Sequence, residues 1–131
     1  MNTTAESRQR LWIVPASPVI WALHFMACYI TAALWCGVVV GREGPLSSAR
    51  AAIGVYTVIA LAGIAVVGWL GWRAHRIPAG GVDGGGEPPH DADTPEDRHR
   101  FLGFATVLLS GLSGVAIIYS ALAAVFIETC Q

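Results

Sequence analysis

Two pairs of side chains in this sequence are of types that do chemistry, and the first pair is His24 with Cys28. At about 100° per residue they share one helix face with Thr31 and Trp35. An imidazole and a thiolate so placed could bind one metal ion, but a structural zinc site takes four ligands. A polar stripe on a helix in lipid also faces the protein interior simply because lipid offers no hydrogen-bond partner. We therefore favour a packed histidine, with metal binding by His24 and Cys28 as the alternative, and expect no cofactor.

Cys36 and Cys130 form the second pair. Two thiols can close a disulfide if their Cα atoms come within about 7 Å. They could also handle copper, although no Met or His cluster accompanies them. Either chemistry requires a fold that brings these distant positions together.

The composition predicts that fold to be helical and embedded in a membrane. Hydrophobic residues make up 54% of the 131 positions and charged residues 13%, about half the ~25% of a soluble protein. No Asp, Glu, Lys or Arg occurs in residues 11–41, 51–72 and 101–127, and each window reaches the ~20 residues that cross a bilayer core. The first window is too long for a signal-peptide core. We predict an all-α polytopic membrane protein with three transmembrane helices in a small bundle.

Local signals set the predicted boundaries. Ser17 and Pro18 resemble an N-cap and a first helical residue, and Thr94 with Pro95 does the same for the third helix. Residues 74–94 are rich in Gly, Pro and acids, which predicts a disordered loop. The predicted order is a tail (1–16), a first span (17–41), a short loop (42–50), a second span (51–73), the disordered loop (74–94), a third helix (95–128, with 101–127 in the membrane) and a C-terminal end (129–131).

The arginines predict the orientation. The N-terminal tail and the flanks of residues 74–94 carry six of them, whereas residues 42–50 carry two. Because positive residues stay in the cytoplasm, we expect a bacterial inner-membrane protein with a cytoplasmic N-terminus and a periplasmic C-terminus. Cys36 and Cys130 would then lie near the oxidising compartment, where a disulfide between them is plausible.

Small and hydroxylated residues predict where the helices pack, since helices in lipid associate through close contact and buried polar groups. On the third helix a stripe with spacings of four and three comprises Thr106, Ser110, Ser113, Ile117, Ser120 and Ala124. The second helix offers Gly54, Thr57, Leu61 and Gly68, and the first offers Gly37 and Gly41. These residues would either hold the three helices together or contact another membrane protein, and both interpretations remain open.

Parts of the first and third helices resemble a known family. The residues that carry the resemblance are Ser17-Pro18, Ile20-Trp21, Leu23-His24-Phe25, Tyr29, Cys36, Phe101-Leu102, Leu112-Ser113 and Cys130. They resemble a small family of three-helix proteobacterial inner-membrane proteins, typically encoded beside a haem-copper cytochrome c oxidase and its copper-insertion assembly factor. The resemblance implies an accessory or assembly role in the respiratory chain.

The leading hypothesis is therefore an accessory subunit or assembly partner of a cytochrome oxidase, acting through helix–helix contacts. Its partners would be the lipid bilayer and respiratory oxidase subunits, not nucleic acid. No nucleophile, base and orienting group occur together, so we expect no enzyme. One alternative is a redox or metal-handling protein using Cys36 with Cys130 or His24 with Cys28. Another is an oligomeric small transporter, although no charged residue at the midplane marks a path.

Overall fold

A computed structural model describes residues 11–39, 41, 45–76, 95–127 and 130, with the backbone alone for 95–99. Its elements are α2 (Ala16–Leu34), which continues as the π-helix η1 (Trp35–Val39), then α3 (Ser47–Arg76) and α4 (Pro95–Phe126). Three helical stretches in the described residues are long and apolar enough to cross a membrane: Leu11–Val39, Ser47–Arg76 and Arg100–Phe126. The prediction of three such helices is thereby confirmed.

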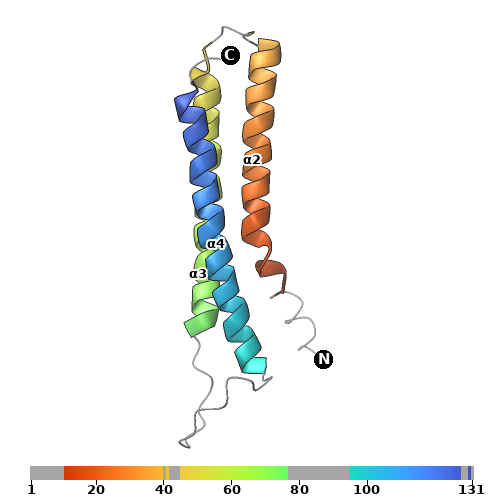
Figure 1. The fold of residues 1–131 in the computed structure, drawn as a ribbon, viewed down its shortest axis with the longest axis vertical. Helices are drawn as coiled ribbons and strands as arrows, with labels where there is room; N and C mark the ends of the chain where they lie inside the picture. Colours follow the sequence, from red (N-terminus) through yellow and green to blue (C-terminus); the bar gives the residue numbers. More distant parts are fainter. Residues whose placement is uncertain (1–10, 40, 42–44, 77–94, 128–129, 131) are drawn as a thin grey trace, which may run out of the picture.

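The three helices run alternately up, down and up in one elongated bundle (Figure 1). α3 and α4 contact each other along most of their length, and α2 lies beside both. The end of η1 therefore lies near the start of α3 and the end of α4 (Figure 1). This arrangement decides which parts of the chain can meet at each end of the bundle.

The prediction that Ser17 caps the first helix is wrong. Pro15 occupies the N-cap position, and the helix begins at Ala16. Pro18 is thus in the first turn, where its missing N–H has no intrahelical partner to lose. Ser17 instead lies inside the helix with none of its surface exposed. The predicted cap Thr94 and most of the predicted loop 74–94 lie outside the described residues, while residues 74–76 belong to α3.

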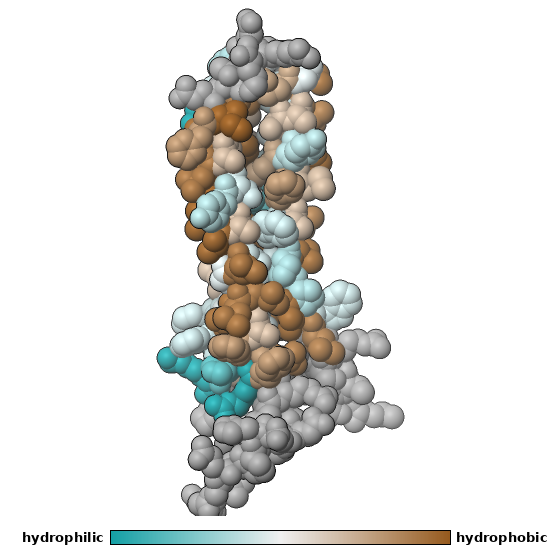
Figure 2. Space-filling model, in the orientation of Figure 1, coloured by the Kyte–Doolittle hydropathy of each residue, from teal (hydrophilic) through white to brown (hydrophobic). Residues whose placement is uncertain are grey.

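A narrow apolar core lies between the helices. Ala60 and Ile64 of α3 meet Ile117 of α4, and Ile20 and Leu61 pack against them. The buried apolar side chains of α3, together with Leu46 just before it, recur every three, four or seven residues, as helix–helix packing requires. They are Leu46, Ala49, Ile53, Ala60 and Ile64. Most other large apolar side chains are exposed, and Figure 2 shows them covering the length of the bundle, with hydrophilic groups gathered at one end.

Only some of the predicted packing glycines pack. Gly68 does, because a Cβ there would lie 3.4 Å from Ser110 Cβ. The assignment of Gly54 to a packing face is wrong for contacts within this chain, since a Cβ there meets nothing within 4 Å. Among the described residues, a Cβ on Gly37 or Gly41 likewise meets nothing within 4 Å. The buried face of α3 follows Ile53 instead, and its neighbour Gly54 is turned about 100° away.

The backbones of α3 and α4 approach each other closely at Gly71 and Gly103. A Cβ on Gly103 would lie 3.0 Å from the carbonyl oxygen of Gly71 and 3.0 Å from the backbone nitrogen of His75. A Cβ on Gly71 would lie 3.0 Å from Thr106 and 3.2 Å from the oxygen of Gly103. The two glycines thus let the α3 and α4 backbones touch, as small residues do between membrane helices.

Candidate functional site

A seam of buried polar side chains runs between the helices. Its most buried members, with at most 6% of their surface exposed, are Ser17, His24, Thr106, Ser110 and Ser113. The hydroxyl oxygens of Ser17 and Ser110 lie 2.7 Å apart and share a hydrogen bond from α2 to α4. The predicted stripe on α4 therefore faces its own bundle, and Ser17 supplies a partner from α2.

His24 bonds α2 to α3. Its Nε2 lies 3.1 Å from the hydroxyl oxygen of Thr57. The Thr57 hydroxyl is 2.7 Å from the carbonyl oxygen of Ile53 and must donate its proton there, so Oγ1 accepts from His24 Nε2–H. The imidazole is then the tautomer protonated on Nε2. Cys28 Sγ lies 3.5 Å from the same nitrogen, one helical turn along.

The arrangement around His24 is that of a packing contact. His24 Nε2 is bonded to a hydroxyl, while the buried Nδ1 has no hydrogen-bond partner among the described residues. Cys28 is a free, half-buried cysteine. The described residues hold no group of three or more His, Cys, Asp or Glu that could share a metal ion. His24 and Cys28 are therefore neighbours, as predicted from their spacing, and the contacts around them are hydrogen bonds.

Two other hydroxyls of the α4 stripe are used within their own helix. Thr106 donates to the carbonyl oxygen of Leu102 at 2.8 Å, and Ser120 donates to that of Ala116 at 2.9 Å. Such bonds four residues back are the common fate of hydroxyls on lipid-embedded helices. The polar groups of this stripe are thus largely satisfied inside the chain.

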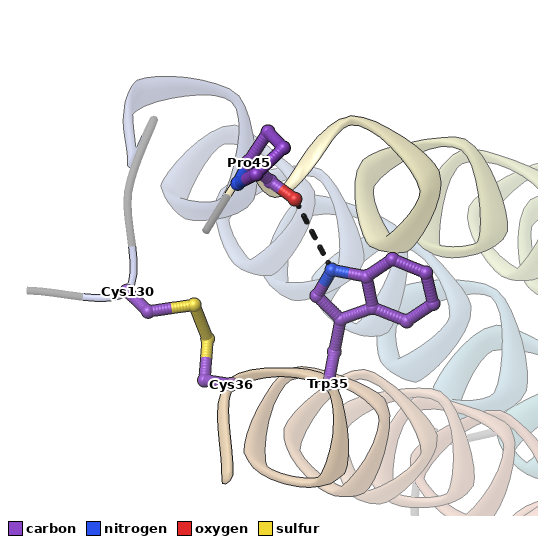
Figure 3. The surroundings of a disulfide bond; sticks show 4 residues. All are labelled: Trp35, Cys36, Pro45 and Cys130. Carbon is purple, nitrogen blue, oxygen red and sulfur yellow. Dashed lines mark hydrogen bonds between the residues drawn. A yellow bond between two sulfur atoms is a disulfide. The ribbon is translucent and has the colours of Figure 1, made fainter. Parts of the chain in front are cut away.

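At one end of the bundle, three bonds tie the helix ends together, and Figure 3 shows the first two of them, the Cys36–Cys130 disulfide and the Trp35–Pro45 hydrogen bond. A disulfide joins Cys36 in η1 to Cys130, with a Cα–Cα distance of 5.6 Å. The indole N–H of the adjacent Trp35 donates to the carbonyl oxygen of Pro45 at 3.2 Å. Arg50 at the start of α3 donates to the carbonyl oxygen of Val125 at 2.6 Å. Each helix end is therefore linked to another one, and the disulfide connects positions 94 residues apart.

The opposite end carries cationic groups. The last turn of α3 contains Arg73, His75 and Arg76. The guanidinium of Arg76 lies 4.7 Å from the centre of the Trp72 ring, and His75 Nδ1 lies 3.4 Å from the carbonyl oxygen of Arg100. An arginine over an indole is a favourable cation–π contact. The two ends of the bundle thus differ: a disulfide links the helix ends at one, and at the other the last turn of α3 is basic.

Sequence reasoning missed the contacts of four residues that join the helices. Ser17 was assigned to a cap, although it lies seven residues before His24 and so continues the same face. Neither Gly71 nor Gly103 is among the residues predicted to pack, although the α3 and α4 backbones approach each other there. Arg50 was counted as a loop charge, whereas it belongs to α3 and reaches α4.

No protein-family model matches this chain, and neither a curated protein nor a solved structure does.

Proposed function

We propose that the chain is a multi-pass protein of the bacterial inner membrane, with its N-terminus in the cytoplasm and its C-terminus in the periplasm. Two independent features support this orientation. The arginine-rich flanks of residues 74–94 favour the cytoplasm for that end of the bundle. The Cys36–Cys130 disulfide is at the other end, and disulfides persist in the oxidising periplasm.

Within that membrane the chain is an accessory subunit or assembly partner of a haem-copper cytochrome oxidase, acting through helix–helix contacts. One observation carries this proposal: most of the buried polar groups between the helices are hydrogen-bonded inside the chain, while the outer surface is formed mainly by large apolar side chains. Such a bundle, held together by its own internal hydrogen bonds, offers other membrane proteins an apolar surface to pack against. The oxidase itself as the partner rests on the resemblance of the first and third helices.

Affinity purification in a mild detergent tests the oxidase. A tagged chain expressed from its own locus should recover oxidase subunits with their haem absorbance, whereas an unrelated three-helix inner-membrane protein with the same tag should not. Recovery of a haem-free homo-oligomer would overturn the proposal.

The surface that contacts the oxidase can be located by alanine variants. Pairs of exposed residues on each helix serve this purpose, because none of them contributes to the core. The pairs are Leu23 with Tyr29 on α2, Val58 with Ile59 on α3, and Leu112 with Tyr119 on α4. We expect one pair to lose oxidase recovery while the thermal stability of the purified chain stays unchanged, and the other two pairs to serve as its controls.

Reporter fusions test the orientation. A reporter that is active only in the periplasm should be active when fused after Gln131 and inactive when fused within residues 77–94. The opposite result would overturn the orientation, and with it the assignment of the disulfide end to the periplasm.

A further inference from the structure

A shallow groove lies between α3 and α4 on the outside of the bundle. Its walls include Trp69 and Trp72 of α3 and Val107 of α4, and Gly68 and Gly111 are among the residues that line it. Its volume of about 530 Å³ is within the roughly 300–1,000 Å³ of small-molecule sites. A Cβ added to Gly111 would meet nothing within 4 Å, so the groove is open at this residue.

The groove leads towards the basic last turn of α3. Arg73 follows Trp69 by four residues and Arg76 follows Trp72 by four, so both arginines continue the groove wall along α3. The Arg76 guanidinium lies over the Trp72 ring at 4.7 Å. On the other wall Arg100 lies two turns before Val107 on α4. The apolar groove is thus followed at one end by three exposed arginines, Arg73, Arg76 and Arg100.

We propose that this groove binds one anionic phospholipid, with an acyl chain against Trp69 and Gly111 and the phosphate beside Arg73 and Arg76. The inference rests on the proposed membrane location. The positive charge of Arg73 and Arg76 at the end of an apolar groove favours a ligand with an acyl chain and an anionic headgroup. Basic groups between helices at the cytoplasmic side recognise anionic headgroups, and arginine binds phosphate with several N–H donors.

A second copy of the chain fits this groove less well. Two copies packed in the same orientation through this face would bring their Arg73 and Arg76 side chains towards each other. Like charges that meet in a poorly solvated interface repel. A phosphate neutralises the same arginines, which favours the lipid.

Native mass spectrometry of the purified chain tests the proposal, with phosphatidylglycerol and phosphatidylcholine of equal acyl length supplied in equal amounts. We expect one phosphatidylglycerol to be retained in preference, by roughly fivefold to thirtyfold, the effect of one to two basic residues near anionic lipid. R73Q/R76Q should remove the preference, while R73K/R76K keeps most of it because the charge remains.

Two matched glycine variants test the groove itself. Gly111→Leu places a side chain in open space within the groove and should reduce retention of both lipids. Gly54→Leu makes the same change on α3, where a Cβ also meets nothing within 4 Å but which is not among the groove-lining residues, and should retain lipid as the wild type does. Circular dichroism and thermal unfolding establish that each variant is folded.

Equal retention of the two lipids by the wild type would overturn the proposal. Equal lipid retention by Gly111→Leu and Gly54→Leu would also overturn it. A wild-type dimer that carries no lipid, and that Gly111→Leu dissociates, would assign the groove to a second copy of the chain instead. The assay uses the purified chain alone, so its outcome does not depend on whether oxidase subunits are recovered.

Discussion

The hydroxyl oxygens of Ser17 and Ser110 lie 2.7 Å apart, although 93 positions separate these residues in the chain. Neither side chain has more than 5% of its surface exposed. The bond connects the first turn of α2 with α4, and Ser110 also touches α3, since it lies beside Gly68. This one hydroxyl pair therefore brings all three helices together.

Loss of either serine should destabilise the bundle by an amount that depends on the other. Ser17→Ala and Ser110→Ala each remove the shared bond, so a double-mutant cycle should give a coupling of about 0.6 kcal/mol, the average for hydrogen bonds between membrane helices. Reversible unfolding in mixed micelles measures it. Ser120→Ala is the control, because its hydroxyl bonds its own helix and should show no coupling to Ser17. Strict additivity of Ser17→Ala and Ser110→Ala would contradict the bond.

His24 should be in the neutral form that carries its proton on Nε2. Thr57 uses its own proton on the Ile53 carbonyl, so only His24 can supply the proton between Nε2 and Oγ1. Nitrogen NMR of histidine-labelled protein should show a protonated Nε2 and an unprotonated Nδ1 for His24, with signals assigned by their loss in His24→Ala. Observation of the opposite tautomer would contradict this assignment, because Nε2 would then accept a proton from Thr57 or Cys28.

The same contact predicts a stability difference. Thr57→Val keeps the side-chain shape but removes the acceptor for Nε2–H, and should cost about 0.6 to 1.7 kcal/mol of unfolding free energy. Cys28→Ala removes only the weak sulfur contact at 3.5 Å and should cost less than Thr57→Val. Metal content measured alongside should be equal in wild type and His24→Ala; a His24-dependent metal would favour the ligand interpretation.

The stripe on α4 was predictable because Ser and Thr mark which face of an otherwise apolar helix turns inward. On α3 the prediction relied on small residues as well, and it selected Gly54 but missed Gly71. Apolar residues surround the whole of a membrane helix, so hydrophobic periodicity does not single out the buried face, and glycine occurs on both faces. In the middle of α3, the polar signal on the side that faces the other helices came from Thr57.

Ser17 shows a different limit. Serine before proline is a strong local signal for a helix start, but the tertiary contact with Ser110 decides what its hydroxyl does. Its position seven residues before His24 was the signal for the buried face. The juxtaposition of Cys36 and Cys130 could be anticipated because both lie at helix ends that an up-down-up bundle brings together, whereas the Arg50–Val125 bond depends on side-chain geometry that no motif encodes.

Thiol labelling should distinguish the disulfide from free cysteines. The chain has three cysteines, and only Cys28 is free in the structure. Alkylation of the denatured, unreduced protein should therefore modify one cysteine, and alkylation after reduction should modify all three. Cys28→Ser is the control and should change these results to none and two. Modification of all three cysteines before reduction would show that the bridge does not form in the purified protein.

Reduction should also weaken the bundle. The disulfide closes a loop of 94 residues, and for loops of about this size in soluble chains the entropy model gives roughly 4.7 kcal/mol. Helices that stay inserted have less freedom to lose, so we expect about 2 kcal/mol, the low end of the usual range. Thermal unfolding with and without reductant measures the change. Cys36→Ala/Cys130→Ala should match the reduced wild type and no longer respond to reductant.

The contact between Gly71 and Gly103 predicts the most position-specific effect. A methyl group at Gly103 would lie 3.0 Å from two backbone atoms of α3, the oxygen of Gly71 and the nitrogen of His75. Backbone atoms cannot relieve such a contact by a rotamer change, as a side chain can. Gly103→Ala should therefore separate the helices locally and cost about 1–3 kcal/mol, the usual range for overpacking. Gly54→Ala adds the same methyl group where nothing lies within 4 Å and should be neutral or stabilising by up to about 1 kcal/mol, because alanine favours helix. Unfolding in detergent compares the two variants directly. Since both changes raise helix propensity alike, a loss of stability confined to Gly103→Ala can arise only from the contact across α3 and α4, and equal effects of the two substitutions would refute that contact.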